Sequence, residues 1–149
     1  MANLFWSLLG IIAGAFIAIQ APINAHLSRG LGLPVAAAAF SFLSGAIVLG
    51  AVTAIVTRVQ GISLDWRAPA PWTFAAGGFF GAGYVTIATM LVPRIGAAAL
   101  MAFLVAGQLI AGMVLDRIGF MGVAVREISL GRVGGAVLLL AGALLVRFY

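Results

Sequence analysis

The chain has 149 residues, of which 64% are hydrophobic and 7% are charged, and its mean hydropathy is +1.25. Soluble domains are about 45–50% apolar and about 25% charged, so this composition excludes an ordinary soluble protein and indicates an integral membrane protein. The net charge of +5 does not indicate nucleic-acid binding, because the eight arginines are scattered singly at segment ends instead of forming a patch.

Four long segments contain no charged residue and no histidine: residues 1–25, 30–57, 68–93 and 95–115. Each is at or above the roughly 18–20 residues needed to cross about 30 Å of hydrocarbon. A fifth segment, residues 133–146, reaches that length if it begins near Leu130 and its flanking arginines extend to the head groups. All five are expected to be helices, because an unpaired strand cannot satisfy its backbone in lipid. The sequence therefore predicts an all-α integral membrane protein with a single domain over residues 1–149.

In chain order, the expected helices cover residues 4–27, 34–57, 71–92, 96–115 and 130–147. Pro34 is expected to open the second helix and Pro71 to stand at the start of the third, while Pro93 is expected to separate the third from the fourth. The first segment is longer than a signal-peptide core and lacks a convincing cleavage site, so we expect it to be retained as a helix.

The first helix carries two amides within an otherwise apolar run. Gln20 and Asn24 are four residues apart and so project from nearly the same face. Pro22 has no N–H, which leaves the carbonyl of Ala18 without its helical partner, and a helix break at these two residues is predicted to line the same site. An unpartnered amide in hydrocarbon is costly, so the pair is expected to contact either a ligand or a neighbouring helix.

Two further residues complete the predicted substrate-binding set: Gln108, near the middle of the fourth helix, and Tyr84, in the third. Ser41 and Ser44 in the second helix can bond carbonyls of their own helix, so we expect them to be structural.

No Asp or Glu lies in the central part of any predicted span. Proton-coupled carriers commonly place a carboxylate there, since a buried carboxyl can titrate near neutral pH. His26 and Asp116 lie at helix ends and are expected to be solvated boundary residues. The sequence has no catalytic triad, no metal-ligand spacing and no phosphate-binding loop, so we expect neither an enzyme nor a bound cofactor or metal.

Small residues recur at spacings that allow helices to approach closely, as at Gly77 and Gly81 in the third helix. In the fifth helix, Gly131, Gly135 and Gly142 are predicted to form a dimer-packing surface. Five short helices cannot readily enclose a site at the bilayer midplane, so a second copy in the opposite orientation is expected to complete it. The arginines divide five to three between the two sides, a bias weak enough to permit both orientations. A parallel oligomer remains an alternative.

Several sequence blocks resemble the small five-helix YdcZ-type proteins of the drug/metabolite transporter superfamily: GxxxGxxxxxQxPxN, PVAAAAFSFLSG, GGFFGAGYV, VPRIGAAAL with VAGQLIAGMVLDRIGFMG, and GRVGGAVLLLAGALLV. The resemblance implies a multi-pass protein of the bacterial inner membrane with a transport role. It also implies half-size chains that work as antiparallel homodimers or with a paired homologous subunit. Small multidrug relatives carry an essential glutamate in the first helix, and the nearest position here is the neutral Gln20.

These observations lead to one functional expectation with two alternatives. The expectation is half of a dimeric secondary transporter, embedded in the lipid bilayer, that moves a small polar or zwitterionic solute. The first alternative is a passive channel for small solutes or ions. The second is a structural membrane subunit that transports nothing.

Overall fold

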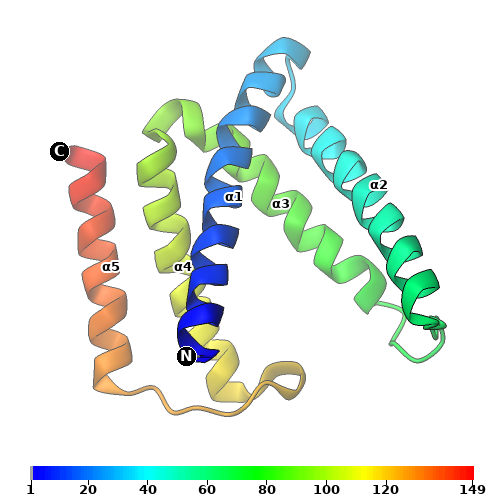
Figure 1. The fold of residues 1–149 in the computed structure, drawn as a ribbon. Coiled ribbons are helices and arrows are strands. Elements are labelled where there is room, and N and C mark those ends of the chain that lie inside the picture. The colour runs from blue at the N-terminus through cyan, green and yellow to red at the C-terminus, as the bar shows by residue number, and fades with distance from the viewer. Residues whose placement is uncertain (1) are drawn as a thin grey trace. The chain divides into compact units, whose positions relative to one another are not determined.

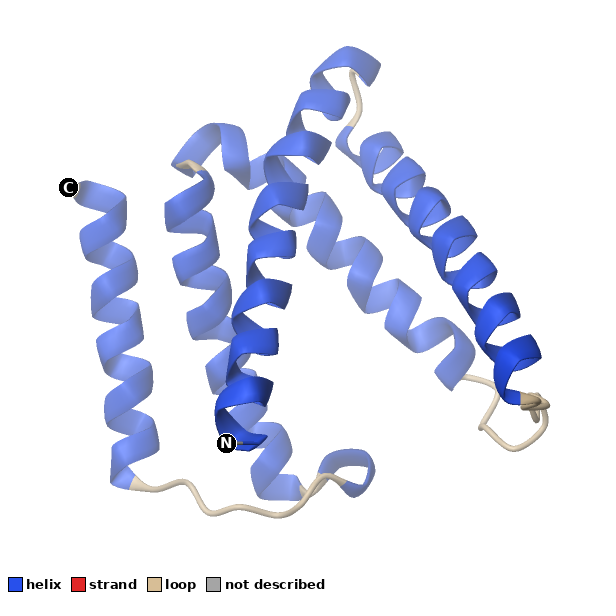
Figure 2. Ribbon diagram, in the orientation of Figure 1, coloured by secondary structure: helices blue, strands red, loops and turns tan. Residues whose placement is uncertain are grey.

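The computed structural model describes the backbone of residues 2–149 and the side chains of residues 4–149. Over this range the chain is helical, with no strand (Figure 2). Five helices are long and apolar enough to cross a membrane: α1 (Ala2–Leu31), α2 (Pro34–Gln60), α3 (Thr73–Ile95), α4 (Ala97–Ile118) and α5 (Leu130–Phe148). A short 3-10 helix, η1 (Phe120–Gly122), follows α4. The predicted all-α fold with five spans is confirmed.

The structure agrees with the prediction at Pro34 and differs from it at Pro93. Pro34 occupies the first turn of α2, as predicted. Pro93, however, lies inside α3, so the prediction that it separates the third and fourth helices is wrong. A proline near the end of a membrane helix removes one backbone hydrogen bond without ending the helix. The division falls at Gly96 instead, whose φ of +81° lies in the left-handed region that favours glycine.

The chain forms two compact units, the first ending at Pro93 and the second beginning at Arg94. In the first unit, α1 and α2 meet at a two-residue connection, residues 32–33, and diverge away from it (Figure 1). The third helix approaches α2 at Gly81, where an added Cβ would lie 2.7 Å from a ring carbon of Phe42. The ring of Phe42 therefore packs where this glycine has no side chain, whereas Gly77 has open space at its Cβ.

In the second unit, α4 packs along α5. The buried residues of α5 are Ala136 and Ala143, which lie seven residues apart and so fall on one face of the helix. The connection between the two helices is held by an ion pair between Asp116 and Arg132 and by the amide of Arg126, which donates to the Asp116 carbonyl at 3.0 Å. Asp116 is thus a paired residue at the end of α4 and not simply a solvated one.

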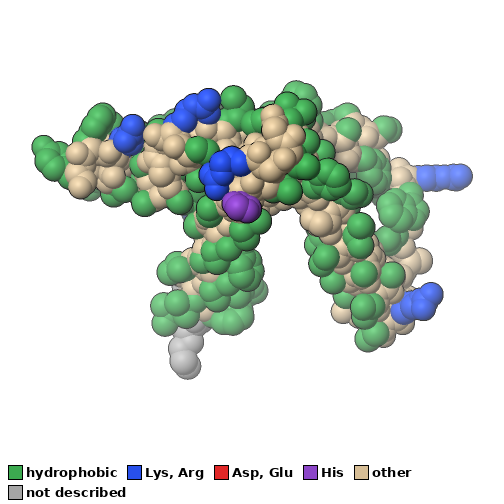
Figure 3. All heavy atoms as spheres, turned by 90° about the horizontal axis from the view of Figure 1, so that it is seen from above, with side chains coloured by type: hydrophobic (Ala, Val, Ile, Leu, Met, Phe, Trp, Pro, Cys, Tyr) green, Lys and Arg blue, Asp and Glu red, His purple; other side chains and the backbone are tan. Residues whose placement is uncertain are grey.

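Most of the molecular surface is apolar, as expected for helices that face lipid. Large hydrophobic side chains are exposed on all five spanning helices. Hydrophobic side chains, in green, are spread over the helices in Figure 3. All eight arginines lie near helix ends or in the connections between helices, which leaves the middle parts of the helices apolar.

One buried hydroxyl in the first unit lacks a hydrogen bond. The Thr89 side chain in α3 is 2% exposed, and its Oγ1 has no partner among the described residues. An unsatisfied buried hydroxyl costs about 1–3 kcal/mol, so replacing it with a methyl group of similar shape removes a penalty. We expect Thr89→Val to stabilise the protein by about 1 kcal/mol, measured by unfolding the purified protein in mixed micelles. Thr86→Val, on a half-buried residue of the same helix, is the matched control, and a destabilised Thr89→Val would contradict the expectation.

Candidate functional site

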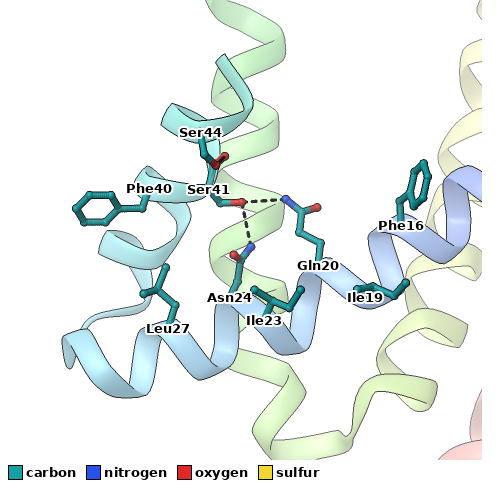
Figure 4. Close-up of a pocket in the computed structure, with 9 residues that line it drawn as sticks. All are labelled: Phe16, Ile19, Gln20, Ile23, Asn24, Leu27, Phe40, Ser41 and Ser44. Carbon is teal, nitrogen blue, oxygen red and sulfur yellow. Dashed lines mark hydrogen bonds between the residues drawn. The ribbon is translucent and has the colours of Figure 1, made fainter. Parts of the chain in front are cut away.

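Two amides of α1 and one serine of α2 meet at a single oxygen atom. Gln20 Nε2 donates to Ser41 Oγ at 3.0 Å, and Asn24 Nδ2 donates to the same oxygen at 3.3 Å (Figure 4). Asn24 is 4% exposed and Gln20 is half-buried. We call these three residues the amide–serine cluster. The structure thus brings Gln20 and Asn24 together, as their four-residue spacing predicts.

The register of the α1–α2 hairpin explains why Ser41 is the partner. Asn24 lies seven residues before the end of α1 at Leu31, and Ser41 lies seven residues after the start of α2 at Pro34. At about 1.5 Å of rise per residue, both lie about 10 Å from the connection and therefore face each other. Gln20 is one turn farther away and reaches Ser41 with its longer side chain.

Ser41 was not predicted to belong to the site. Both serines of α2 were expected to bond their own helix, and only Ser44 does so, donating to the Ser41 carbonyl at 2.9 Å. The first helix was predicted to end at residue 27, but it continues to Leu31. The equal distance of Asn24 and Ser41 from the connection depends on this later end, so the predicted bounds could not identify Ser41.

The amide–serine cluster lines a cavity of about 530 Å³ between α1 and α2 (Figure 4). Gln20 lies within three residues of the middle of the Leu4–Leu31 span, whereas Asn24 and Ser41 lie closer to the connection between α1 and α2. No residue of the lining carries a charge. The lining consists of Phe16, Ile19, Gln20, Ile23, Asn24, Leu27, Phe40, Ser41 and Ser44.

A second, smaller cavity lies between α1 and α3 and shares the two amides with the first. Its volume is about 10 Å³, which is the space of roughly one water molecule. Three polar side chains line it, namely Gln20, Asn24 and Tyr84, together with four apolar ones. The structure therefore places Tyr84 beside the same amides that face the larger cavity.

The remaining predicted site residues lie elsewhere. Helix α1 is continuous through Pro22, so the expected helix break does not interrupt it. Ala18 is half-buried and Pro22 is exposed, and neither lines either cavity. Gln108 is exposed on α4 in the second unit. His26 is exposed near the end of α1, where its Nδ1 lies 3.3 Å from Arg29 Nη2.

The glycines predicted to pack the dimer lie on α5. Gly135 and Gly142 line an apolar groove of about 570 Å³ that α4 and α5 form within the second unit. Gly131 is exposed at the start of α5 and does not line this groove. An added Cβ at Gly135 or Gly142 would meet nothing within 4 Å, so the groove is open at both positions.

The two serines of α2 allow a matched test of the cluster. Ser41→Ala leaves the amide nitrogens of Gln20 and Asn24 without their acceptor, so we expect a loss of about 1–3 kcal/mol in the free energy of unfolding. Ser44→Ala removes one bond to a carbonyl of the same helix, and we expect a change within about 0.5 kcal/mol. Unfolding of both variants in mixed micelles measures the difference, and equal losses would show that Ser41 does not hold the amides.

A comparison of the chain with known protein families gives a match over most of its length. The family model described as "Putative inner membrane exporter, YdcZ" matches residues 5–145. The match takes in every residue that lines the two cavities of the first unit. No curated protein and no solved structure gives a significant match. The chain belongs to the YdcZ family and is a multi-pass transport protein of the inner membrane.

Proposed function

We propose that this chain is one half of a dimeric secondary transporter, a half-size carrier of the drug/metabolite transporter type, that moves a small polar or zwitterionic solute. The observation that carries the proposal is the amide–serine cluster, which lines a cavity of about 530 Å³ between two membrane-spanning helices. Membership of an exporter family supports transport, and the polar groups in the cavity support a solute that makes hydrogen bonds.

In this proposal Gln20 and Asn24 orient the solute. Ligand cavities are commonly apolar, with a few polar groups that fix the orientation of what they bind, and this cavity has that composition. Each hydrogen bond to the solute contributes about 0.5–1.5 kcal/mol. Tyr84 lines the small cavity beside the two amides and is proposed as a further residue that binds the solute. Gln108, on α4, is also proposed to bind the solute.

The dimer is proposed to be antiparallel and to form on the groove of α5. Between membrane helices, close packing replaces the hydrophobic effect as the source of association, and small residues allow that packing. The open groove at Gly135 and Gly142 offers such a surface. A second copy of this chain, or a homologous subunit, would occupy it in the opposite orientation.

Reconstitution into liposomes separates this proposal from its two alternatives. Liposomes are loaded with unlabelled amino acids, sugars and polyols, and the uptake of each labelled compound is followed as its concentration rises. A carrier gives uptake that saturates and that is accelerated by the compound inside. A passive channel gives flux that rises linearly with concentration. A structural subunit gives no flux, and none of the compounds raises the unfolding temperature of the protein.

Solute binding is expected to be nearly independent of pH. The nine residues that line the cavity include no Asp, Glu, His or Cys, so no lining group gains or loses a proton near neutral pH. For a solute that does not titrate itself, we expect the dissociation constant to change less than about twofold between about pH 6 and pH 8. Equilibrium binding at the two pH values measures this. A tenfold change would identify a titrating group, with His26→Gln as the first variant to test.

A further inference from the structure

The chemistry of the cavity between α1 and α2 narrows the kind of solute that it can hold. We propose that it takes an uncharged solute that joins an aromatic or bulky apolar part to one neutral group, such as a primary amide, that both donates and accepts hydrogen bonds. This inference rests on the proposed transport function, because it concerns the same site, and it selects the uncharged solutes of that proposal over the zwitterionic ones.

The first argument is electrostatic. A charged group moved from water into the interior of a membrane protein loses several kcal/mol of hydration free energy unless an opposite charge compensates for it. None of the nine lining residues carries a charge, so the cavity supplies no counter-charge for a cation or an anion. An uncharged solute avoids this loss.

The second argument is the hydrogen-bonding capacity that the cluster leaves unused. Ser41 Oγ accepts from both amide nitrogens, and these are the hydrogen bonds that the side chains of Gln20 and Asn24 make within the described chain. Each amide therefore keeps a carbonyl oxygen that can accept and a second N–H that can donate. A group that offers one donor and one acceptor side by side, as a primary amide does, can pair with either amide of the cluster.

The third argument is the apolar part of the lining. Phe16 and Phe40 stand on the two sides of the cluster, and both are more than half exposed. Three aliphatic side chains, Ile19, Ile23 and Leu27, lie between them along α1 (Figure 4). Aromatic rings prefer offset-stacked or edge-to-face contacts, so an aromatic solute gains more from these positions than a sugar or a polyol does.

Four compounds that share one benzyl group and differ in charge test the proposal. They are phenylacetamide, which is neutral, phenethylamine, a cation, phenylacetate, an anion, and phenylalanine, a zwitterion. Binding to the full chain in lipid nanodiscs is measured by equilibrium dialysis, with empty nanodiscs subtracted to remove partitioning into lipid. We expect phenylacetamide to bind at least tenfold more tightly than each of the other three.

A variant that alters only charge gives a second readout. Gln20→Glu keeps the length of the side chain and places a carboxylate at the cluster. We expect the ranking to reverse, with phenethylamine bound at least tenfold more tightly than phenylacetamide at about pH 8. The control is Gln60→Glu, because Gln60 is exposed at the end of α2 and does not line the cavity. It should leave the original ranking unchanged.

The outcomes separate this inference from the proposed transport function. If phenethylamine, phenylacetate or phenylalanine binds to the parent chain as tightly as phenylacetamide or more tightly, the proposal that the solute is uncharged is wrong. Absence of binding by all four would overturn the aromatic class, whereas saturable uptake of another solute in the liposome assay would leave the transport function standing. If Gln20→Glu fails to fold, the affinities of the four compounds for the parent chain still test whether the site prefers an uncharged solute.

Discussion

Gln20→Leu is expected to lower transport about two- to tenfold at low solute concentration while leaving the protein folded. The substitution removes an amide that contributes one hydrogen bond to the solute, worth about 0.5–1.5 kcal/mol, or about two- to tenfold in affinity. Leucine has a volume similar to that of glutamine, and it is a favourable residue in membrane-spanning helices. The bond from Asn24 to Ser41 remains, so the α1–α2 hairpin keeps one of its two side-chain links.

The test is the initial rate of uptake into liposomes, measured for the solute that gives saturable uptake with the parent chain. Gln60→Leu is the matched control, since it makes the same change at an exposed residue outside the cavity. Size-exclusion chromatography and tryptophan fluorescence report whether each variant is folded. Uptake that survives both Gln20→Leu and Asn24→Leu would show that the amides only join the helices, and the site should then be sought around Tyr84 and Gln108.

Gly135→Leu is expected to dissociate the dimer without disturbing the fold of the single chain. An added Cβ at Gly135 meets nothing within 4 Å inside the chain, so the larger side chain can be accommodated there. It would instead fill the α5 groove in which the partner is proposed to pack. The control is Gly134→Leu, because Gly134 is exposed, also has open space at its Cβ, and does not line the groove.

The measurement is the fraction of dimer at equal protein-to-lipid ratio, determined by crosslinking and by light scattering in detergent. We expect Gly135→Leu to be mainly monomeric, whereas Gly134→Leu should match the parent chain. A dimer fraction that is unchanged in Gly135→Leu would place the interface on another surface.

The relative orientation of the two copies can be determined from disulfides between introduced cysteines. The chain contains no cysteine of its own that would compete with them. Leu130 and Phe148 lie at opposite ends of α5 and are both exposed. They are eighteen residues apart, which is about 27 Å along the helix. In an antiparallel pair, Leu130→Cys of one copy should crosslink to Phe148→Cys of the other. In a parallel pair, each substituted residue should crosslink to its own equivalent.

The sequence predicted the helices well, because their signal is length and hydrophobicity alone. Five apolar segments predict five spans, and each must be helical because an unpaired strand cannot satisfy its backbone hydrogen bonds in a bilayer. The position of Pro93 was less predictable, since proline removes one hydrogen bond from a membrane helix and this loss need not end the helix. The turn at Gly96 depends instead on a left-handed backbone conformation, which a glycine permits but does not require.

The candidate site was predictable only in part. The spacing of Gln20 and Asn24 placed them on one face, but spacing within one helix cannot identify the partner on another helix. Ser41 became evident only when the register of the hairpin was known. The buried, unpartnered hydroxyl of Thr89 gave no sequence signal, because most threonines in membrane helices bond a carbonyl of their own helix.

The shared acceptor at Ser41 has a consequence for the speed of a transport cycle. When no solute is present, both amides are already hydrogen-bonded, so the unoccupied site is close to a resting state of low free energy. A solute can pair with the amide oxygens and the second N–H groups that Ser41 leaves unused, so its binding and release break neither bond between α1 and α2. The two amides are held in place before the solute arrives, and little side-chain ordering has to accompany binding. Such a site favours rapid loading and rapid release of the solute.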